Sequence, residues 1–203
     1  MADTAVATKS VALALADERA LMRQGYQFLD EKRMLLAAEM LRGLKQHDRL
    51  GDELGPGLRA AQAALKRALQ RHGLEGLIAH PPSGFNPSAP AIRRASFLGV
   101  GTLAVDFAPQ ASPRPDSTLD ASPEARACRQ AYIALLAPLA QLAACRGNLE
   151  RLAAEYRRTE RRAKALENVL LPEIESALAT TLDRLERGDQ EEAVRIRVAG
   201  RRR

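Results

Sequence analysis

Few residues of this 203-residue sequence occur in patterns that could support catalysis or bind a metal ion. The stretch GVGTLA at 99–104 fits the loose Gly-x-Gly-x-x-Ala pattern of a dinucleotide-binding loop, but VDFAP follows it. That pattern requires a helix at this point, because the helix N-terminus binds the phosphates. The three histidines have no metal-ligand spacing, and neither a Gly-x-x-x-x-Gly-Lys-Ser/Thr loop nor a Gly-x-Ser-x-Gly motif occurs. The sequence therefore indicates no catalytic, cofactor-binding or metal-binding residues.

A cluster of cations is the most distinctive chemical feature of the sequence. The run RRTERRAKALE at 157–167 places five basic side chains in eight positions, with one glutamate among them. Since each residue advances about 100° around a helix, Thr159 and Leu166 share one face with Ala163. The cations on the other faces are Arg157, Arg158, Arg161, Arg162 and Lys164. We therefore expect the apolar face to contact another helix and the cations to point away from it.

Two long helices are predicted to carry these charges. Apolar residues make up 46% of the chain but aromatic residues only 3%, so Ala and Leu dominate. Small, helix-forming side chains suit thin helix pairs better than a thick core. Apolar residues recur at spacings of three and four over 8–75 and 122–188, and steps of this kind are typical of a coiled coil. In the first helix the series includes Leu21, Phe28, Leu35 and Leu41.

Several residues are expected to start, bend or end these helices. Ser122 is a suitable N-cap for the second helix, with Pro123 in its first turn. The stretch GDELGPG at 51–57, with its proline and three glycines, predicts a kink or short break in the first helix. Pro138 and Pro172 predict local bends in the second helix. Gly188 predicts its end, which would leave a basic C-terminal tail at 189–203.

The segment between the helices, 76–121, is a connector that contains seven of the 11 prolines. Its stretch SFLGVGTLAVDF at 96–107 has the strongest strand signal in the chain. We expect a short β-hairpin there, with Gly99 and Gly101 in the turn or in a bulge. Because a single hairpin is marginally stable alone, it should lie against a helix or a partner. The apolar residues of the hairpin would be Phe97, Val100 and Val105.

The order of these segments predicts an all-α protein with one short hairpin, built as a long antiparallel two-helix coiled coil. Neither helix could bury its apolar stripe alone, so each should bury the stripe of the other. If the chain reverses within the connector, the numbers of facing residues sum to about 195, which places Arg162 near Arg33. Together with Lys32 and Arg161, these residues would form a basic collar around the helix pair.

Net charge and cysteine content limit the environment of the chain. The net charge of +6 and the pI of about 9.8 suit acidic partners, anionic membrane surfaces or nucleic acid. Cys128 and Cys145 would lie about 25 Å apart on one helix, too far for a disulfide, so we expect reduced thiols. The stretch VALALA at 11–16 is too short for a signal peptide, and no run approaches the length of a transmembrane helix. These features predict a soluble chain.

Both long helices resemble the D subunit of V-type and archaeal-type rotary ATPases and ATP synthases. The run GYQFLDEKRMLLAAE at 25–39 resembles the family's first-helix run, in which a Gly precedes a Leu, a Lys-Arg pair and a later Glu. The run at 157–178 resembles the family's Thr-x-Arg-Arg-x-x-Ala-Leu-Glu motif with its following Pro. Two features depart from the family: the stretch at 51–57, and Lys164 where Asn is common. The matching residues of the second motif are Thr159, Arg161, Arg162, Ala165, Leu166, Glu167 and Pro172.

The resemblance implies a central rotor shaft that transmits torque between a catalytic ring and a membrane ring. The helix ends would insert into the ring of alternating catalytic A and regulatory B subunits, and the lower part would bind the F subunit and the socket C subunit, called d in eukaryotes. ATP chemistry would belong to the A and B subunits, so this chain would be non-catalytic and need no cofactor. It would lie in the cytoplasm, peripheral to the cell membrane, and its hairpin would be associated with stimulating ATP hydrolysis. The residues expected to contact the ring are Lys32, Arg33, Arg161, Arg162 and Glu167.

Two other classes of protein share parts of this pattern. A non-rotary coiled-coil adaptor, such as a stalk chaperone of an export-type ATPase, would also bind an ATPase ring but would not need a central hairpin. A basic coiled coil that binds nucleic acid would show steeply salt-dependent binding, and the mixed charges and scarce aromatics disfavour it. Coupling to H⁺ and to Na⁺ are both compatible with the sequence, as are ATP synthesis and hydrolysis.

Overall fold

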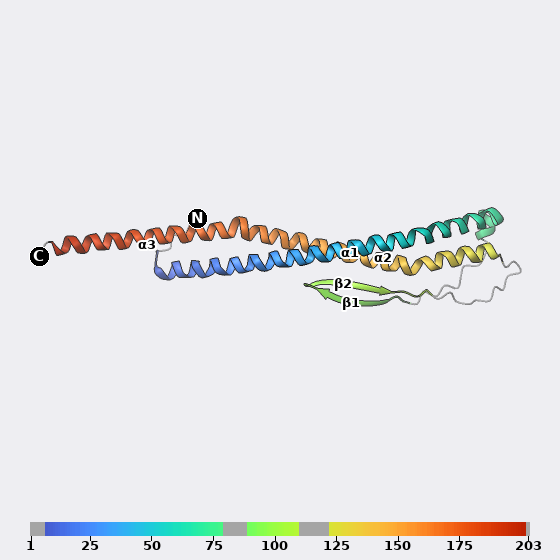
Figure 1. Ribbon diagram of the computed structural model, residues 1–203, viewed down its shortest axis with the longest axis horizontal. Helices are drawn as coiled ribbons and strands as arrows, with labels where there is room; N and C mark the ends of the chain where they lie inside the picture. Colours follow the sequence, from blue (N-terminus) through green and yellow to red (C-terminus); the bar gives the residue numbers. More distant parts are fainter. Residues whose placement is uncertain (1–6, 79–88, 110–121, 202–203) are drawn as a thin grey trace. The chain divides into compact units, whose positions relative to one another are not determined.

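The chain is described by a computed structural model that covers residues 7–78, 89–109 and 122–201. Helix α1 (Lys9–Ile78) is followed by strands β1 (Ala91–Phe97) and β2 (Val100–Asp106) (Figure 1). Helix α2 (Pro123–Ala165), the π-helical turn η1 (Leu166–Leu170) and helix α3 (Leu171–Gly200) complete the described part. This order confirms the predicted fold class, which is all-α apart from a short antiparallel hairpin.

These elements form two compact units. Unit 1 consists of Met1–Leu35 and Tyr156–Arg203, and unit 2 of Leu36–Glu155. Within unit 1, α1 runs antiparallel to the C-terminal elements: Arg23 forms a 2.6 Å ion pair with Glu175. The segments 79–88 and 110–121 of the predicted connector lie outside the described residues.

The two helices of unit 2 pack through a seven-residue series on α1 in which large and small residues alternate. Leu36 and Leu50 are buried, and the glycines between and after them face leucines of α2. A Cβ at Gly43 would lie 2.8 Å from Leu149 Cδ2, and one at Gly57 would lie 3.0 Å from Leu135 Cδ2. In both pairs the residue numbers sum to 192, close to the predicted value of about 195, as expected for antiparallel coiled-coil packing.

The break predicted at 51–57 is absent, because α1 is helical throughout this stretch, including Pro56. Pro56 removes one backbone hydrogen bond. Gly57, however, provides the space that Leu135 of α2 occupies, so tertiary packing stabilises the helix where its local propensity is poor. Non-helical backbone occurs later in α1, at Gly73, where φ is 68° and ψ is 176°.

The proline at 172 disturbs the second helical segment as predicted. The π-helical turn η1 precedes it, and the Leu171 N–H donates to the Leu166 carbonyl. Proline has no N–H, and its ring clashes with the carbonyl four residues earlier, so a wider turn accommodates it. Pro138, by contrast, lies inside α2, whose helix is assigned without interruption from Pro123 to Ala165.

The helix end predicted at Gly188 is wrong, because α3 continues to Gly200. Ion pairs four residues apart support the helix on both sides of the glycine: Asp183 with Arg187 at 2.7 Å, and Glu191 with Arg195 at 3.7 Å. The segment predicted as a basic tail is therefore helical up to Gly200.

The hairpin starts earlier than the sequence indicated, since β1 begins at Ala91 rather than near 96. Pairing with β2 supplies the hydrogen bonds that a stretch without strong apolar alternation lacks. Leu98 and Gly99 form the turn with positive φ values of 50° and 86°. Gly101 lies in β2, opposite Ser96. Of the predicted apolar residues, Val100 is buried and pairs with Phe97, while Val105 is half-buried and pairs with Ile92.

Small side chains allow close helix packing elsewhere in unit 2. Ala64, Ala68 and Cys128 form a buried cluster between α1 and α2. Both cysteines are buried and free, and burial raises the pKa of the Cys128 and Cys145 thiols. These thiols therefore pack as small apolar groups.

Candidate partner-binding surfaces

The basic cluster of unit 1 has the orientation that helical periodicity predicted. Thr159 and Ala163 are each only 2% exposed, so this face of α2 is buried. The five cations of the run 157–164 are all exposed. Burial of the opposite face fixes the helix rotation and thereby holds the cations outward.

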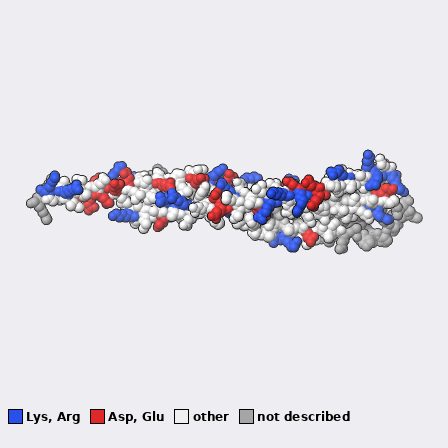
Figure 2. Space-filling view, in the orientation of Figure 1, with Lys and Arg blue, Asp and Glu red and all other residues white. Residues whose placement is uncertain are grey.

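Four of these cations have no partner among the described residues. Lys164 pairs with Glu160 at 3.0 Å, four residues earlier on the same helix. The other four, which take part in no hydrogen bond or ion pair within the described ranges, are Arg157, Arg158, Arg161 and Arg162. Elsewhere acidic and basic side chains are interspersed along the face in view (Figure 2), and pairs such as Arg146 with Glu150 at 3.1 Å are common. These arginines therefore concentrate positive charge that the chain itself does not neutralise.

The predicted collar residues on α1 are engaged within unit 1. Arg33 is half-buried and forms a 2.5 Å ion pair with Asp30, and Lys32 also has an interaction partner. Glu167, the acidic residue predicted at the collar, is exposed on η1. Burial, and then the neighbouring Glu167 carboxylate, raise the pKa of the Tyr26 hydroxyl on α1. The structure thus brings the five predicted contact residues into one unit, with Arg161 and Arg162 as the members that have no partner among the described residues.

An apolar stripe on α1 was not separated from the helix interface by sequence reasoning. Leu21, Phe28 and Leu35 recur every seven residues and are 64%, 66% and 52% exposed. Leu36, the next residue along the chain, is fully buried. The sequence contains two adjacent apolar series, and periodicity alone does not tell which one the second helix covers. Exposed large apolar residues in a row are typical of a surface that binds a partner.

The hairpin of unit 2 is held against α2 by polar side chains. The Asn148 amide accepts from the Leu103 N–H and donates to the Leu103 carbonyl, both at 2.8 Å. Arg151 donates to the Gly101 carbonyl at 2.8 Å and to Asn148 Oδ1 at 2.6 Å. A cavity of about 560 Å³ lies between the hairpin, α1 and α2.

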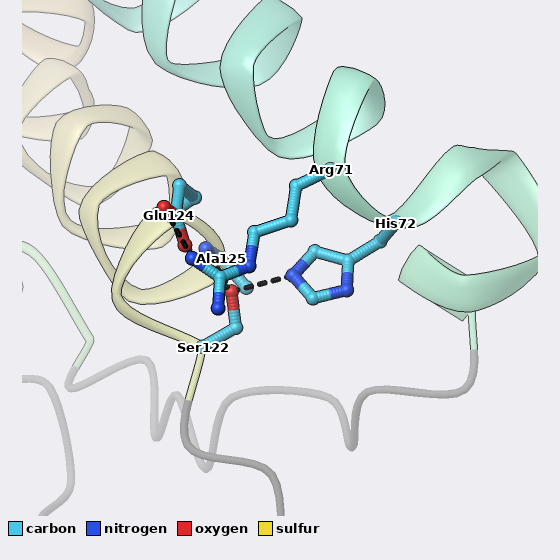
Figure 3. A network of polar contacts seen from close by, with 5 residues as sticks. All are labelled: Arg71, His72, Ser122, Glu124 and Ala125. Carbon is cyan, nitrogen blue, oxygen red and sulfur yellow. Dashed lines mark hydrogen bonds and ion pairs between the residues drawn. The ribbon is translucent and has the colours of Figure 1, made fainter.

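A second polar network joins α1 to the start of α2 (Figure 3). Ser122 caps α2 by accepting from the Ala125 N–H at 3.2 Å, which confirms the predicted N-cap. A 2.6 Å hydrogen bond links Ser122 Oγ to His72 Nε2, and Arg71 donates to Glu124 at 2.7 Å. The backbone N–H of Glu124, and then Arg71, lower the pKa of the Glu124 carboxyl. Because the serine hydroxyl is occupied as a helix cap, this group stabilises the helix pair and is not arranged for catalysis.

The described residues 7–78, 89–109 and 122–201 contain no group of three His, Cys, Asp or Glu side chains placed to hold a metal ion. In the same ranges, none of the helices combines the length and apolar character that crossing a membrane requires. The surfaces described above are therefore the parts of the chain that the structure offers for recognition.

Comparison with known proteins places the chain in a family. Residues 12–201 match the family model described as the D subunit of ATP synthase. The chain is 32% identical over 200 residues to the V-type ATP synthase D subunit of Anaeromyxobacter dehalogenans, covering 95% of this chain and 94% of the relative. It is 25% identical over 193 residues to the Thermotoga neapolitana protein of that name, covering 94% of each chain. A Treponema pallidum relative, the second V-type ATP synthase D subunit of that organism, is 28% identical over 167 residues, covering 82% of this chain and 80% of its own length. The chain belongs to the family of ATP synthase D subunits.

Proposed function

We propose that this chain is the central rotor stalk subunit of a V-type ATP synthase or ATPase. It transmits torque between ATP synthesis or hydrolysis in a ring of A and B subunits and ion translocation through a membrane ring. Membership of the D-subunit family, with relatives named as V-type ATP synthase subunits, supports the choice of complex. The observation that carries the proposal is the surface of unit 1, where arginines without partners among the described residues and an exposed apolar stripe occur together.

The composition of that surface suits a protein partner. Arginine and large apolar residues are enriched at protein interfaces. Phe28 is 66% exposed on α1, and Arg161 and Arg162 are exposed on α2 without partners among the described residues. Contact with a ring would remove the apolar side chains from water and neutralise the arginines with acidic or polar groups. Lys32, Arg33 and Glu167 are the remaining residues that we assign to this contact.

In this role the chain is not an enzyme. ATP chemistry belongs to the A and B subunits, and the chain determines which catalytic interface closes at a given angle of the stalk. The F subunit and the socket C subunit bind other parts of the chain, and the hairpin is associated with stimulating hydrolysis. The protein then lies in the cytoplasm, peripheral to the cell membrane as part of the complex.

Purification of the tagged chain from its native cells under mild conditions tests the complex. We expect two large subunits in equal amounts and ATP hydrolysis in the eluate. A non-rotary adaptor would instead bring down a single export-type ATPase, and that result would refute the rotor assignment. The hairpin and the family membership already argue against the adaptor.

Neutralising two arginines tests the role of the collar. The double variant Arg161→Gln, Arg162→Gln should weaken ring binding roughly two- to thirtyfold, since exposed ion pairs contribute about 0.2–1 kcal/mol each. It should also lower the ion transport obtained per ATP hydrolysed. The matched control is Lys66→Gln, Arg67→Gln, which removes the same charge from exposed positions of α1 in unit 2. Unchanged affinity and turnover in the collar variant would exclude this role.

A further inference from the structure

The two outer edges of the β-hairpin are treated differently by the rest of unit 2. A two-residue turn joins the strands, so Phe97 and Val100 form the first hydrogen-bonded pair. Hydrogen-bonded and non-hydrogen-bonded pairs then alternate along an antiparallel ladder. The residues of the non-hydrogen-bonded pairs direct their N–H and C=O groups away from the partner strand. They are Gly101, Leu103 and Val105 on β2, and Ile92, Arg94 and Ser96 on β1.

Side chains of α2 satisfy the outer edge of β2. The Asn148 amide bonds both backbone groups of Leu103, as a neighbouring strand would, and Arg151 bonds the Gly101 carbonyl. These contacts agree with the alternation deduced from the turn. They also fix the hairpin to α2, so a load on the hairpin is transferred to that helix.

The outer edge of β1 has no such cover. Within the described part of the chain, no hydrogen bond joins the outward backbone groups of Ile92, Arg94 and Ser96 to another element. Residues 91–96 are all exposed, and Ile92 alone is 51% exposed. A row of free N–H and C=O groups on an edge strand is a template for an additional strand.

The charges on β1 decide what kind of strand fits. Arg93 and Arg94 are consecutive, so they point to opposite faces of the sheet and place one cation on each face. A second copy of β1, paired antiparallel about Arg94, would bring these cations opposite one another, and like charges directly opposite destabilise a pair. A strand with carboxylates on either face would gain cross-strand attraction instead.

We propose that the open edge of β1 binds an extended, acidic segment of another subunit of the complex as a third strand. This inference rests on the proposed function, because it takes the partner from the assembled ATP synthase. The added strand is hydrogen-bonded by Ile92, Arg94 and Ser96 and is selected by Arg93 and Arg94. Through Asn148 and Arg151 its position is communicated to α2.

Amide hydrogen exchange at single-residue resolution tests the pairing, with the isolated chain compared to the purified complex. The amides of Ile92, Arg94 and Ser96 should exchange at least tenfold more slowly in the complex. The inward amides of Arg93 and Ala95 serve as an internal control, since β2 protects them in both samples. Equal exchange of the three outward amides in both samples would overturn the proposal.

The same preparation separates this inference from the proposed function. If the chain does not assemble with ring subunits, the proposed function fails and the inference fails with it. If it assembles and the outward amides stay unprotected, only the inference fails. An isolated chain that dimerises with these amides protected would assign the edge to a second copy and would equally overturn the proposal.

Two variants test the hydrogen bonds and the charge separately. Arg94→Pro removes one outward N–H and leaves the inner ladder intact, which edge strands tolerate. It should abolish the added protection at Ile92 and Ser96 in the complex, while Arg94→Lys should retain it. The double variant Arg93→Glu, Arg94→Glu should also lose that protection. Retained protection in the glutamate variant would show that the edge does not select an acidic strand, and slow exchange at Ala95 verifies that each variant keeps its hairpin.

Discussion

Two adjacent leucines of α1 allow the internal and external functions of the helix to be separated. Leu36 is fully buried, whereas Leu35 is 52% exposed. Truncating a leucine to alanine removes three carbon atoms, each worth about 0.8 kcal/mol when fully buried. Leu36→Ala also leaves a cavity, so we expect a loss of about 2.5–4 kcal/mol of unfolding free energy. Leu35→Ala loses roughly half of the transfer contribution and creates no cavity, which gives about 1 kcal/mol.

Thermal unfolding followed by circular dichroism at 222 nm measures this difference. For a chain of this size 1 kcal/mol shifts Tm by about 2–4 °C. Leu36→Ala should therefore lower Tm by about 5–15 °C and Leu35→Ala by about 2–4 °C. Equal shifts, or a larger shift for Leu35→Ala, would refute the assignment of the buried and exposed series.

Partner binding should show the reverse order. Leu35 belongs to the exposed stripe with Leu21 and Phe28, which we propose contacts the ring. At a temperature where both variants are folded, Leu35→Ala should weaken ring binding more than Leu36→Ala does. Binding curves for the two variants that coincide would remove the stripe from the proposed interface.

Three further outcomes follow from the described residues. Gly51→Ala should raise the unfolding free energy by about 0.5–1 kcal/mol, because this helical glycine has open space around it. Gly43→Ala should gain less or destabilise, since the new Cβ would lie 2.8 Å from a leucine of α2; a larger gain in urea unfolding than for Gly51→Ala would contradict this. Cys128 and Cys145 should react with iodoacetamide at pH 8 at least tenfold more slowly in the folded chain than in urea, because burial raises their pKa; equal rates would disprove their burial. The lowered pKa of Glu124 means that its stabilisation is present above its ordinary pKa of about 4.5 and is lost as pH falls through its folded value. Glu124→Gln should therefore reduce the loss of stability between pH 6 and pH 3.5, and an unchanged loss in urea unfolding would contradict the shift.

Local and periodic features of the sequence were sufficient for much of the architecture. The heptad-like spacing of apolar residues predicted two helices that pair antiparallel, and the Gly57–Leu135 contact matches the predicted register. The outward direction of the cations followed from the rotation of the helix about Thr159 and Ala163. The N-cap at Ser122 followed from residue type alone.

Local signals failed where contacts from distant residues outweigh them. Pro56 is a poor helix residue, yet α1 continues through it because α2 packs against the neighbouring glycine. The start of β1 at Ala91 depends on its pairing with Asp106, 15 residues later in the chain. Gly188 was expected to end the helix, but a glycine with helical neighbours and flanking ion pairs does not force an end.

By itself, then, the sequence determined the periodicity of both helices, the place of the hairpin and the concentration of arginine, because these depend on residue type and spacing. Only the tertiary structure decided which of the two apolar series, that of Leu35 or that of Leu36, is covered. It also decided that Asn148 occupies the β2 edge through Leu103, a residue 45 positions away, so that the β1 edge is the open one. The physical reason is that burial and hydrogen-bond satisfaction belong to pairs of residues that only folding brings together.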